Sequence, residues 1–365
     1  MATKEPVTYE NEEMIQGDKS LSSLYCRKSK VSELNLTNYR NYNQLSLKLD
    51  GSPVVITGRN GAGKTNILES ISFLSPGRGL RSSKLDIVGK IDENGNSHPW
   101  AISSRVDGPE GDCTIGTGVV SPSDNTKRII KIDGEQVKGQ GALTKVFQVM
   151  WLTPQMDGLF ISGSSERRKF LDRLVYNFDS EHASRVYSYE HTMRERMKLL
   201  QQNGDAAWLS ILEKKMAEKA VAIAAARLDA VDVISKSIKL APTAFPKAKI
   251  KVKGEIEEFL SDSSALESEE YILKKLYQAR QLDRQYGRTN FGTHRSDLSV
   301  IHIDKNMPAM SCSTGEQKAL LLSIILAEAR AKSTWNNSTP VLLLDEVIAH
   351  LDEFRRNSLF DEILA

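Results

Sequence analysis

The sequence predicts an α/β fold that carries an inserted, mainly helical second lobe. Two observations place the α/β part at both ends of the chain: a glycine-rich loop at residues 58–65, and an apolar run at 341–344 that closes on Asp345 and Glu346. The third observation is helical periodicity between residues 166 and 290. At 365 residues the chain is long enough to bury a sizeable core across two such parts.

Composition predicts a soluble, cytoplasmic protein. Apolar residues make up 40% and charged residues 26%, which is ordinary for a globular chain. The net charge of +2 is nearly balanced, so a nucleic-acid surface would have to be a local patch. The longest apolar run, 319–327, is shorter than the ~20 residues that cross a membrane. Residues 1–20 lack the apolar core of a secretory signal, and the three cysteines lack metal-ligand spacing.

Changes of pattern along the chain predict four segments. Residues 1–29 are polar and predict a flexible N-terminal extension. Residues 30–165 form the first part of the head, 166–290 the helical lobe, and 291–365 the second part of the head. The expected elements are strands on either side of a polar turn at 37–42, further strands at 100–106, 129–132 and 298–303, and helices at 166–200, 208–240 and 269–286.

The glycine loop has the residue types that hold a triphosphate. A β-branched run at 53–57 precedes it as a predicted strand, and 66–71 follows it as a predicted helix, which is the context that a phosphate-binding loop requires. Its glycines let successive N–H groups face one anion at a helix N-terminus. Lys64 is placed to reach the β- and γ-phosphates, and Thr65 offers its hydroxyl to Mg²⁺. The candidate nucleotide contacts here are Gly58, Arg59, Asn60, Gly61, Ala62, Gly63, Lys64, Thr65 and Asn66.

The two acids after the apolar run are candidates for catalysis. Asp345 is the expected water-mediated partner of Mg²⁺, and Glu346 is the candidate base that orients the attacking water. Gln155, in the segment 151–155, is the candidate sensor between Mg²⁺ and that water. The alternatives are an acidic strand end that caps the next helix and an exposed loop amide. The phosphate-binding loop in the same chain favours the catalytic interpretation.

The segment 313–317, called the signature segment below, predicts a second nucleotide contact made by another copy of the chain. Ser313 and Gly315 come at the start of a predicted helix, where a serine hydroxyl and free N–H groups form an anion site. With Glu316 they are expected to contact the γ-phosphate across a dimer, and Asp352 lies in a turn that resembles one crossing the same interface. The alternative is a plain serine cap on the helix.

Longer motifs make the chain similar to the RecF family of bacterial recombination-mediator ATPases. They are the segments 38–42, 57–71, 74–81 with its Ser-Pro-Gly-Arg run, 166–173 and 292–298. The resemblance implies an ABC/SMC-type P-loop ATPase head with a helical second lobe, ATP and Mg²⁺ as cofactors, and an ATP-dependent homodimer. It also implies binding to double-stranded and gapped DNA, with RecO- and RecR-like mediator proteins as partners in placing RecA on the gaps.

Three departures from the family pattern bear on the site. Glu346 stands where many relatives have a second Asp, which favours hydrolysis. The signature segment lacks the Arg often found after the serine, so its contact with the opposite nucleotide is expected to differ. The chain stops at Ala365, where the family usually continues with a further strand and a switch-region residue. Either the sequence is truncated or that strand is absent, and no switch residue is assigned.

Basic residues indicate where DNA would bind. If 245–254 is a strand, its alternating lysines lie on one face ~6.6 Å apart, comparable with the phosphate spacing along one DNA strand. The alternative is an edge strand that uses lysine against unwanted pairing. A second basic group follows the first nucleotide helix, and the alternatives for it are a solvated face or partners for carboxylates. The candidate DNA contacts are Arg78, Arg81, Lys84, Lys247, Lys249, Lys251 and Lys253.

The sequence therefore favours a slow, DNA-stimulated ATPase used as a switch in recombinational repair. ATP closes two copies on duplex DNA, and hydrolysis through Glu346 releases them. The alternatives are the ATPase subunit of a membrane transporter and an ATP-gated DNA clamp that does not hydrolyse ATP. The roles of His294 and Arg295 stay open between the head interface and a structural hydrogen-bonding pair.

Overall fold

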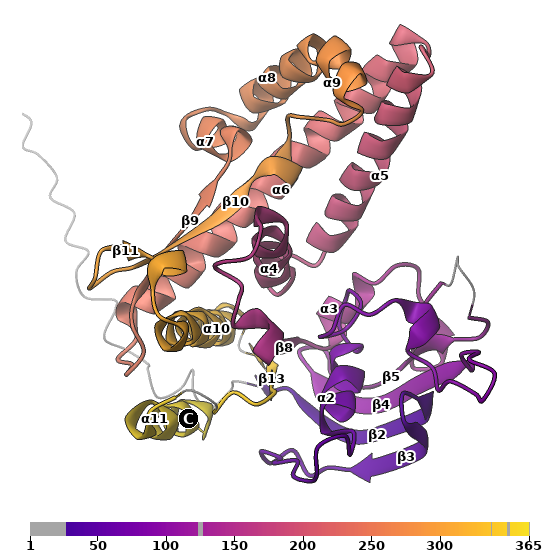
Figure 1. The fold of residues 1–365 in the computed structure, drawn as a ribbon, viewed down its shortest axis with the longest axis vertical. Coiled ribbons are helices and arrows are strands. Elements are labelled where there is room, and N and C mark those ends of the chain that lie inside the picture. The colour runs from indigo at the N-terminus through magenta and orange to yellow at the C-terminus, as the bar shows by residue number, and fades with distance from the viewer. Residues whose placement is uncertain (1–26, 123–126, 337, 349–350, 365) are drawn as a thin grey trace, which may run out of the picture.

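The computed structural model describes residues 27–122, 127–336, 338–348 and 351–364, arranged in two lobes (Figure 1). A large sheet with α2 forms the lower right of the view, and helices α5 to α9 form the upper lobe. Of the expected N-terminal extension, 1–29, residues 1–26 lie outside the described residues. Arg27–Lys28 form a short strand, β1. No helix among the described residues has the length and apolarity needed to cross a membrane.

The largest sheet has six strands in the order β3-β2-β4-β5-β6-β7, all antiparallel to their neighbours. Apolar side chains alternate along β2 and β4, and Leu34, Leu36 and Ile102 lie in one core with Ile71 at the end of α2. The two expected strands that flank the polar turn are confirmed. The strands expected at 100–106 and at 129–132 are confirmed as well. The bounds are β2 Lys30–Tyr39, β3 Tyr42–Lys48, β4 Trp100–Gly108, β5 Gly111–Val119, β6 Ile129–Ile132, β7 Glu135–Gln136 and α2 Lys64–Ser72.

Two parallel strands lie between the lobes and support the site. Strand β13, Val341–Leu344, pairs with β8, Val149–Leu152, so the predicted strand at 341–344 is confirmed. All four residues of β8 are buried, as expected of a strand covered on both faces. β1 pairs in parallel with β12, Ser338–Thr339. The nearby short elements are η1 Leu85–Ile87, α3 Ala142–Val146 and η2 Pro154–Met156.

The predicted strand at 53–57 is wrong. These residues form no ladder, and the side chains of Val54 and Val55 are 54% and 83% exposed. A β-branched sequence forms a strand only where another strand pairs with it, and no described strand pairs with this segment. The glycine loop is therefore entered from an unpaired segment.

The helical lobe is built around one long helix, α6. The predicted helix at 208–240 is confirmed, whereas those at 166–200 and 269–286 are each divided in two. The first divides because the Asp179 carboxylate accepts a hydrogen bond from the Glu181 N–H, which gives the backbone an alternative to the helix. The helices are α4 Ser164–Tyr176, α5 His182–Gln201, α6 Ala206–Leu240, α7 Glu255–Asp262, α8 Ala265–Gln278 and α9 Arg280–Tyr286.

A three-stranded sheet joins this lobe to the signature segment. Its order is β11-β10-β9, with β9 Ala248–Lys253 paired antiparallel to β10 Asp297–His302. The expected boundary at residue 290 therefore falls between two strands of one sheet. The chain continues through β11 Met307–Pro308 and η4 Ala309–Ser311 to Ser313, and η3 Thr293–Arg295 precedes β10.

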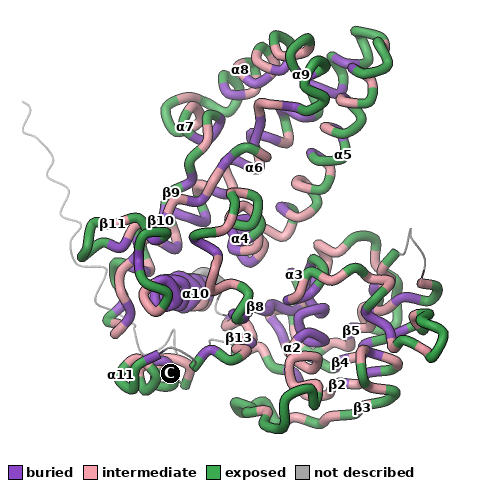
Figure 2. The backbone as a smooth tube through the Cα atoms, viewed as in Figure 1, coloured by how far each residue is buried: buried purple, intermediate pink, exposed green. Residues whose placement is uncertain are grey.

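Helix α10, Thr314–Asn336, lies between the two lobes (Figure 1). Two runs of its apolar residues, Ala319 to Leu322 and Ile324 to Ala327, are buried in one cluster with residues of α4, α6 and β10. A helix that is apolar on all sides is stable only when it is enclosed, and Figure 2 shows α10 as a mostly buried coil. α11, Glu353–Leu364, follows at the periphery.

Candidate nucleotide-binding site

The glycine loop curves tightly before α2. Gly61 and Gly63 have φ of 81° and 96°, in the left-handed region that favours glycine. A Cβ at Gly63 would lie 2.5 Å from the Tyr42 hydroxyl, so the β2–β3 turn is packed directly on the loop. The Lys64 ammonium donates to the carbonyl oxygens of Gly58, at 2.8 Å, and Arg59, at 3.0 Å. The loop thus holds its lysine over the N-terminus of a helix, where backbone N–H groups attract an anion.

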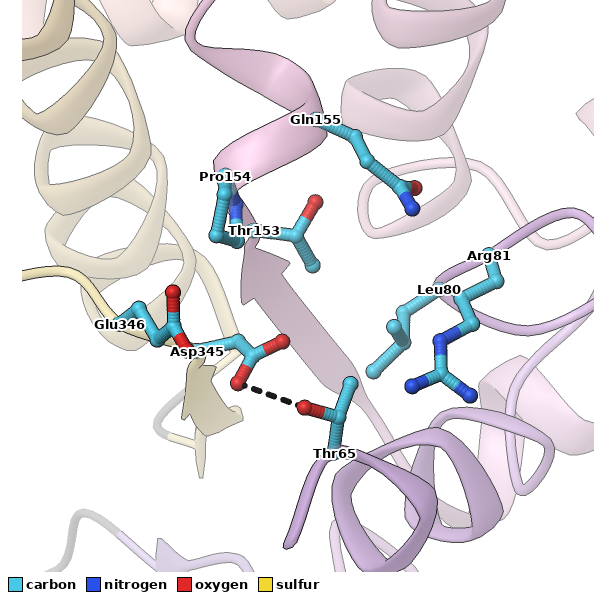
Figure 3. Close-up of a pocket in the computed structure, with 8 residues that line it drawn as sticks. All are labelled: Thr65, Leu80, Arg81, Thr153, Pro154, Gln155, Asp345 and Glu346. Carbon is cyan, nitrogen blue, oxygen red and sulfur yellow. Dashed lines mark hydrogen bonds between the residues drawn. The ribbon is translucent and has the colours of Figure 1, made fainter. Parts of the chain in front are cut away.

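The structure brings the loop together with the acids from the far end of the chain. The Thr65 hydroxyl donates to the Asp345 carboxylate, Oγ1 to Oδ1, at 3.1 Å (Figure 3). Asp345 is fixed because its N–H donates to the Leu152 carbonyl and extends the β13–β8 pairing by one residue. A pocket opens at this contact and is lined by Thr65, Leu80, Arg81, Thr153, Pro154, Gln155, Asp345 and Glu346.

The surroundings of Asp345 set its charge. Burial raises the pKa of Asp345 above its usual value, and the neighbouring Glu346 carboxylate adds to the rise. The hydrogen bond from Thr65 and the positive charges of Arg81 and Lys64 oppose it. A cation bound beside this carboxylate would favour its ionised form.

The candidate sensor and base lie at the same pocket. Gln155 is in η2, directly after β8, and lines the pocket opposite Thr65 (Figure 3). Glu346 follows Asp345 with φ of 49°, a conformation that non-glycine residues seldom adopt. Its side chain is exposed at the pocket rim. Three of the sequence-predicted catalytic and metal residues are therefore neighbours of Thr65.

Thr153, which the sequence reasoning missed, also lines the pocket. Its side chain is only 3% exposed, yet its hydroxyl has no hydrogen-bond partner within the described ranges. A buried hydroxyl without a partner is costly, so such a group fits a pocket whose ligand supplies the missing contact. Its place directly before Pro154 and Gln155, at the end of an apolar strand, is the signal that could have found it.

Lys318 is a second residue that the sequence reasoning missed, and it connects the pocket to the signature helix. Its side chain is 3% exposed, and its ammonium lies 3.4 Å from the Asp157 carboxylate and 3.4 Å from the Glu346 carbonyl oxygen. Asp157 follows Gln155 by two residues, and its other carboxylate oxygen has no partner among the described residues. A lysine directly before the apolar run 319–327 was the available signal.

The signature segment lies outside this pocket. The Ser313 hydroxyl donates to the Glu316 carboxylate at 2.9 Å, and the Glu316 N–H donates back to that hydroxyl at 3.4 Å. This is a capping box at the start of α10, so the plain-cap interpretation is correct for the single chain. An ion pair with Lys305 and the bonds from Ser313 lower the pKa of Glu316 to about 2. Gly315 lies in the same first turn.

Asp352 also stays away from the pocket. Its carboxylate accepts a hydrogen bond from the Arg355 N–H at 2.8 Å, and so it caps the start of α11. The preceding residues 349 and 350 are not among those described. Within one chain, neither Ser313, Gly315, Glu316 nor Asp352 lines the space beside Thr65.

Arg81, a predicted DNA contact, also lines the pocket. Its guanidinium donates to the Asn66 side-chain oxygen at 2.7 Å and lies 3.3 Å from the Glu69 carboxylate. Glu69 is fully buried and also pairs with Arg40 at 2.6 Å, while Asn66 donates to Asn41 at 2.7 Å. The carboxylate partner that was the alternative for Arg81 is observed, its side chain is still 30% exposed, and contact with DNA stays a prediction.

The remaining DNA candidates are exposed, apart from Lys247, which is half-buried. Arg78 and Lys84 are exposed, and the loop that carries Arg78 is fixed by Arg128, which donates to the carbonyls of Phe73, Ser75 and Gly77. Lys247 precedes β9, and its ammonium donates to the Lys239 carbonyl at 2.9 Å. The Lys247 carbonyl accepts from the Ile303 N–H at 3.0 Å, which continues the β9–β10 pairing, and its contact with DNA stays a prediction.

His294 lies in the helical lobe and not at the pocket. Its Nε2 donates to the Thr289 carbonyl at 2.9 Å, which leaves Nδ1 as the acceptor for the Tyr189 hydroxyl at 3.2 Å. Burial lowers the pKa of His294, consistent with a neutral ring in both bonds. His294 therefore has a structural hydrogen-bonding role, and the role of Arg295 stays open.

Comparison with known proteins gives one consistent result. Residues 30–364 match the family model of the RecF/RecN/SMC N-terminal domain. Relatives named DNA replication and repair protein RecF include those of Allorhizobium ampelinum and Rhizobium etli, each 44% identical over 339 residues, which span 92% of this chain and 90% of the relative. The relative from Agrobacterium fabrum is 44% identical over 341 residues, with 93% and 90% covered.

Solved structures agree with this fold. The recombination mediator protein RecF with ATP, in the RecFOR pathway, superimposes with a TM-score of 0.79 at 25% identity, covering 93% of this chain and 90% of that one. A second structure, RecF-ATPrS, gives a TM-score of 0.80 at 24% identity, covering 93% and 91%. The predicted α/β architecture, an ATPase head with a helical lobe, is confirmed by these matches.

Proposed function

This chain belongs to the RecF family, and on that premise we propose how its pocket serves as an ATP-driven switch in DNA repair. The protein is an ATP-binding recombination mediator of DNA repair. The single observation that carries the mechanism is the 3.1 Å contact between Thr65 and Asp345, which places the phosphate loop and both acids at one pocket.

The donor set of the pocket fits Mg²⁺. Thr65 and Asp345 supply a hydroxyl and a carboxylate, and Gln155 and the unpartnered Thr153 hydroxyl line the same space. Mg²⁺ prefers such oxygen ligands and keeps several waters, so a site that relies on a substrate phosphate and one or two protein groups suits it. Thr65, Asp345 and Gln155 would hold the ion, which when bound supplies neutralising charge to the phosphates.

The protein's own groups then divide the work. Lys64 exchanges its loop carbonyls for phosphate oxygens, and the backbone N–H groups of the glycine loop hold the rest of the anion. Glu346, exposed at the rim and fixed through its carbonyl by Lys318, orients a water for attack. Slow turnover suits a switch, because the bound state must outlast the event that it controls.

A second copy of the chain completes the site in this proposal. Ser313, Gly315 and Glu316 lie at the N-terminus of α10, where serine and free N–H groups suit an anion, yet they do not reach the pocket of their own chain. In an ATP-dependent homodimer they contact the γ-phosphate held by the partner, and Asp352 lies at the same interface. The closed dimer holds double-stranded or gapped DNA, and the RecO- and RecR-like proteins of the pathway act on that complex.

The proposal predicts opposite outcomes for two substitutions at the pocket. Lys64→Ala removes the phosphate contact and abolishes ATP-dependent dimerisation, whereas Glu346→Gln retains ATP and prolongs the dimer. Light scattering with Mg-ATP, followed over time, measures both. If both variants dimerise like the parent, nucleotide does not control assembly and the mechanism is wrong.

Phosphate release separates this switch from the non-hydrolysing clamp. The switch requires measurable release by the parent that is lost in Glu346→Gln, while the clamp requires none from either. Family membership and the repair role of the named relatives favour both over a transporter subunit.

A further inference from the structure

One face of the three-stranded sheet carries a row of lysines, Lys249, Lys251 and Lys253, called the lysine face below. Strand β9 buries Ala248, Ile250 and Val252 in the core that it shares with α6 and exposes the three lysines on the other side. Alternate residues of a strand lie on one face, so the ammonium groups project about 6.6 Å apart along it. None of the three forms an ion pair with any residue that the structure describes.

The neighbouring strand does not neutralise this charge. In the β9–β10 register, Lys249 lies opposite Ile301 and Lys251 opposite Ser299, both uncharged. Lys253 lies opposite Asp297, the one acid of β10, but that carboxylate is held by two hydrogen bonds from the Arg167 guanidinium, each 2.7 Å. The lysine face therefore keeps its positive charge.

Positive charge continues beyond the end of the strand. Arg295 is exposed directly before Ser296, and the Arg168 guanidinium donates to the Ser296 carbonyl at 2.8 Å. Neither arginine forms an ion pair within the described ranges. Burial lowers the pKa of Arg168, and the nearby charges of Arg227 and Arg295 add to this, while Asp297 and Asp172 oppose it. In a chain of net charge +2 this is a local excess.

Protection of a sheet edge explains only part of this pattern. β9 is an edge strand, and lysines on an edge discourage pairing with another chain. That role does not account for Arg168 and Arg295, which lie on α4 and η3 and not on the edge strand. The half-buried Arg168 is accounted for by its bond to the Ser296 carbonyl, whereas the exposed Arg295 and the three lysines suit a polyanion with regularly spaced charges.

We propose that the lysine face binds the phosphate backbone of duplex DNA, an inference that rests on the proposed function. Lysines on a flat strand contact phosphates without reading bases, so binding there positions the DNA and carries no sequence preference. The same sheet continues through β10, β11 and η4 to Ser313 (Figure 1). DNA on this face would therefore lie on the element that leads directly to the signature segment.

The test compares two triple variants that lose the same charge. The first is Lys249→Gln with Lys251→Gln and Lys253→Gln. The control is Lys198→Gln with Lys214→Gln and Lys215→Gln, three exposed lysines on α5 and α6. Affinity for a labelled duplex is measured by fluorescence anisotropy with saturating Mg-ATP, from about 50 to about 200 mM salt.

Each phosphate contact contributes about 0.9 to the slope of log affinity against log salt. The lysine-face variant should therefore have a slope shallower by about 2.7, so that across this fourfold salt range it loses about 40-fold less affinity than the parent. The control should keep the parental slope.

Each other outcome has a separate meaning. A parental slope in the lysine-face variant overturns the inference, and self-association of that variant in light scattering would then assign β9 to edge protection. Equal loss of slope in both triple variants also overturns it, because the effect would then be one of net charge. If the parent itself does not bind the duplex, the proposed function fails as well.

Discussion

In the nucleotide pocket Thr65 contacts Asp345 from 280 positions away in the sequence, whereas in the signature segment Ser313 bonds with Glu316 only three positions on. The pocket leaves polar groups without partners, among them the buried Thr153 hydroxyl. The signature segment has satisfied its own side chains in a capping box and an ion pair with Lys305. The pocket therefore has polar groups that a ligand could bond. The side chains of the signature segment already bond with each other, so a ligand there would have to replace those bonds.

A matched motif elsewhere in the chain shows what is general about the signature segment. Ser264 and Glu267 form the same reciprocal capping box at the start of α8, in the helical lobe. Both boxes stabilise a helix by satisfying N–H groups that would otherwise lack partners. The two helices differ in position. Lys318 of α10 contacts Asp157 and the carbonyl oxygen of Glu346, a residue that lines the pocket, whereas α8 lies in the helical lobe.

The largest effect should come from breaking that link. Lys318→Met leaves Asp157 and the Glu346 carbonyl without their buried cation, and we expect a loss of about 1–3 kcal/mol of unfolding free energy. Denaturant unfolding measures it, and phosphate release should fall together with it. Lys305→Met removes a half-exposed cation and should have a clearly smaller effect on unfolding. Equal losses would mean that Lys318 is not special.

A smaller effect should separate the two capping boxes. Ser313→Ala and Ser264→Ala should each cost about 1 kcal/mol, because each removes a helix cap. Only Ser313→Ala should also weaken ATP-dependent dimerisation, which light scattering of both variants with Mg-ATP would show. If Ser264→Ala weakens dimerisation equally, the signature segment acts only as a cap.

The smallest effect concerns the middle of α10, where head and lobe share a core. Glu328 is buried there and accepts a hydrogen bond from Asn177 at 2.6 Å, and burial raises its pKa from 4.5 to about 8, against the nearby charges of Arg173 and Lys332. The folded state therefore holds a proton that the unfolded state releases, so Glu328 lowers stability as pH rises from about 4.5 to about 8.

Glu328→Gln keeps the hydrogen-bond acceptor and removes the titration. We expect a flatter dependence of Tm on pH and a Tm at pH 8 that is higher by about 2–4 °C for each kcal/mol recovered. Thermal unfolding across that pH range measures the change, with the exposed Glu258→Gln as control. A parallel pH profile for Glu328→Gln and the parent would contradict the assignment.

The sequence by itself determined the features that depend on neighbours in the chain. The curve of the glycine loop, the strand at 341–344 with its two acids, the helix at 208–240 and the cap at Ser313 all follow from local spacing and backbone preference. The alternation of lysines on β9 was predictable for the same reason.

Only the tertiary structure decided which distant groups meet. It left 53–57 unpaired, set Arg81 beside the buried Glu69, placed Thr153 at the pocket and joined Lys318 to Asp157 and Glu346. Such contacts depend on how elements pack in space, and a strand or a charge acquires its role from the partner that packing supplies. The spacing of residues along the chain does not predict which distant residue that partner is.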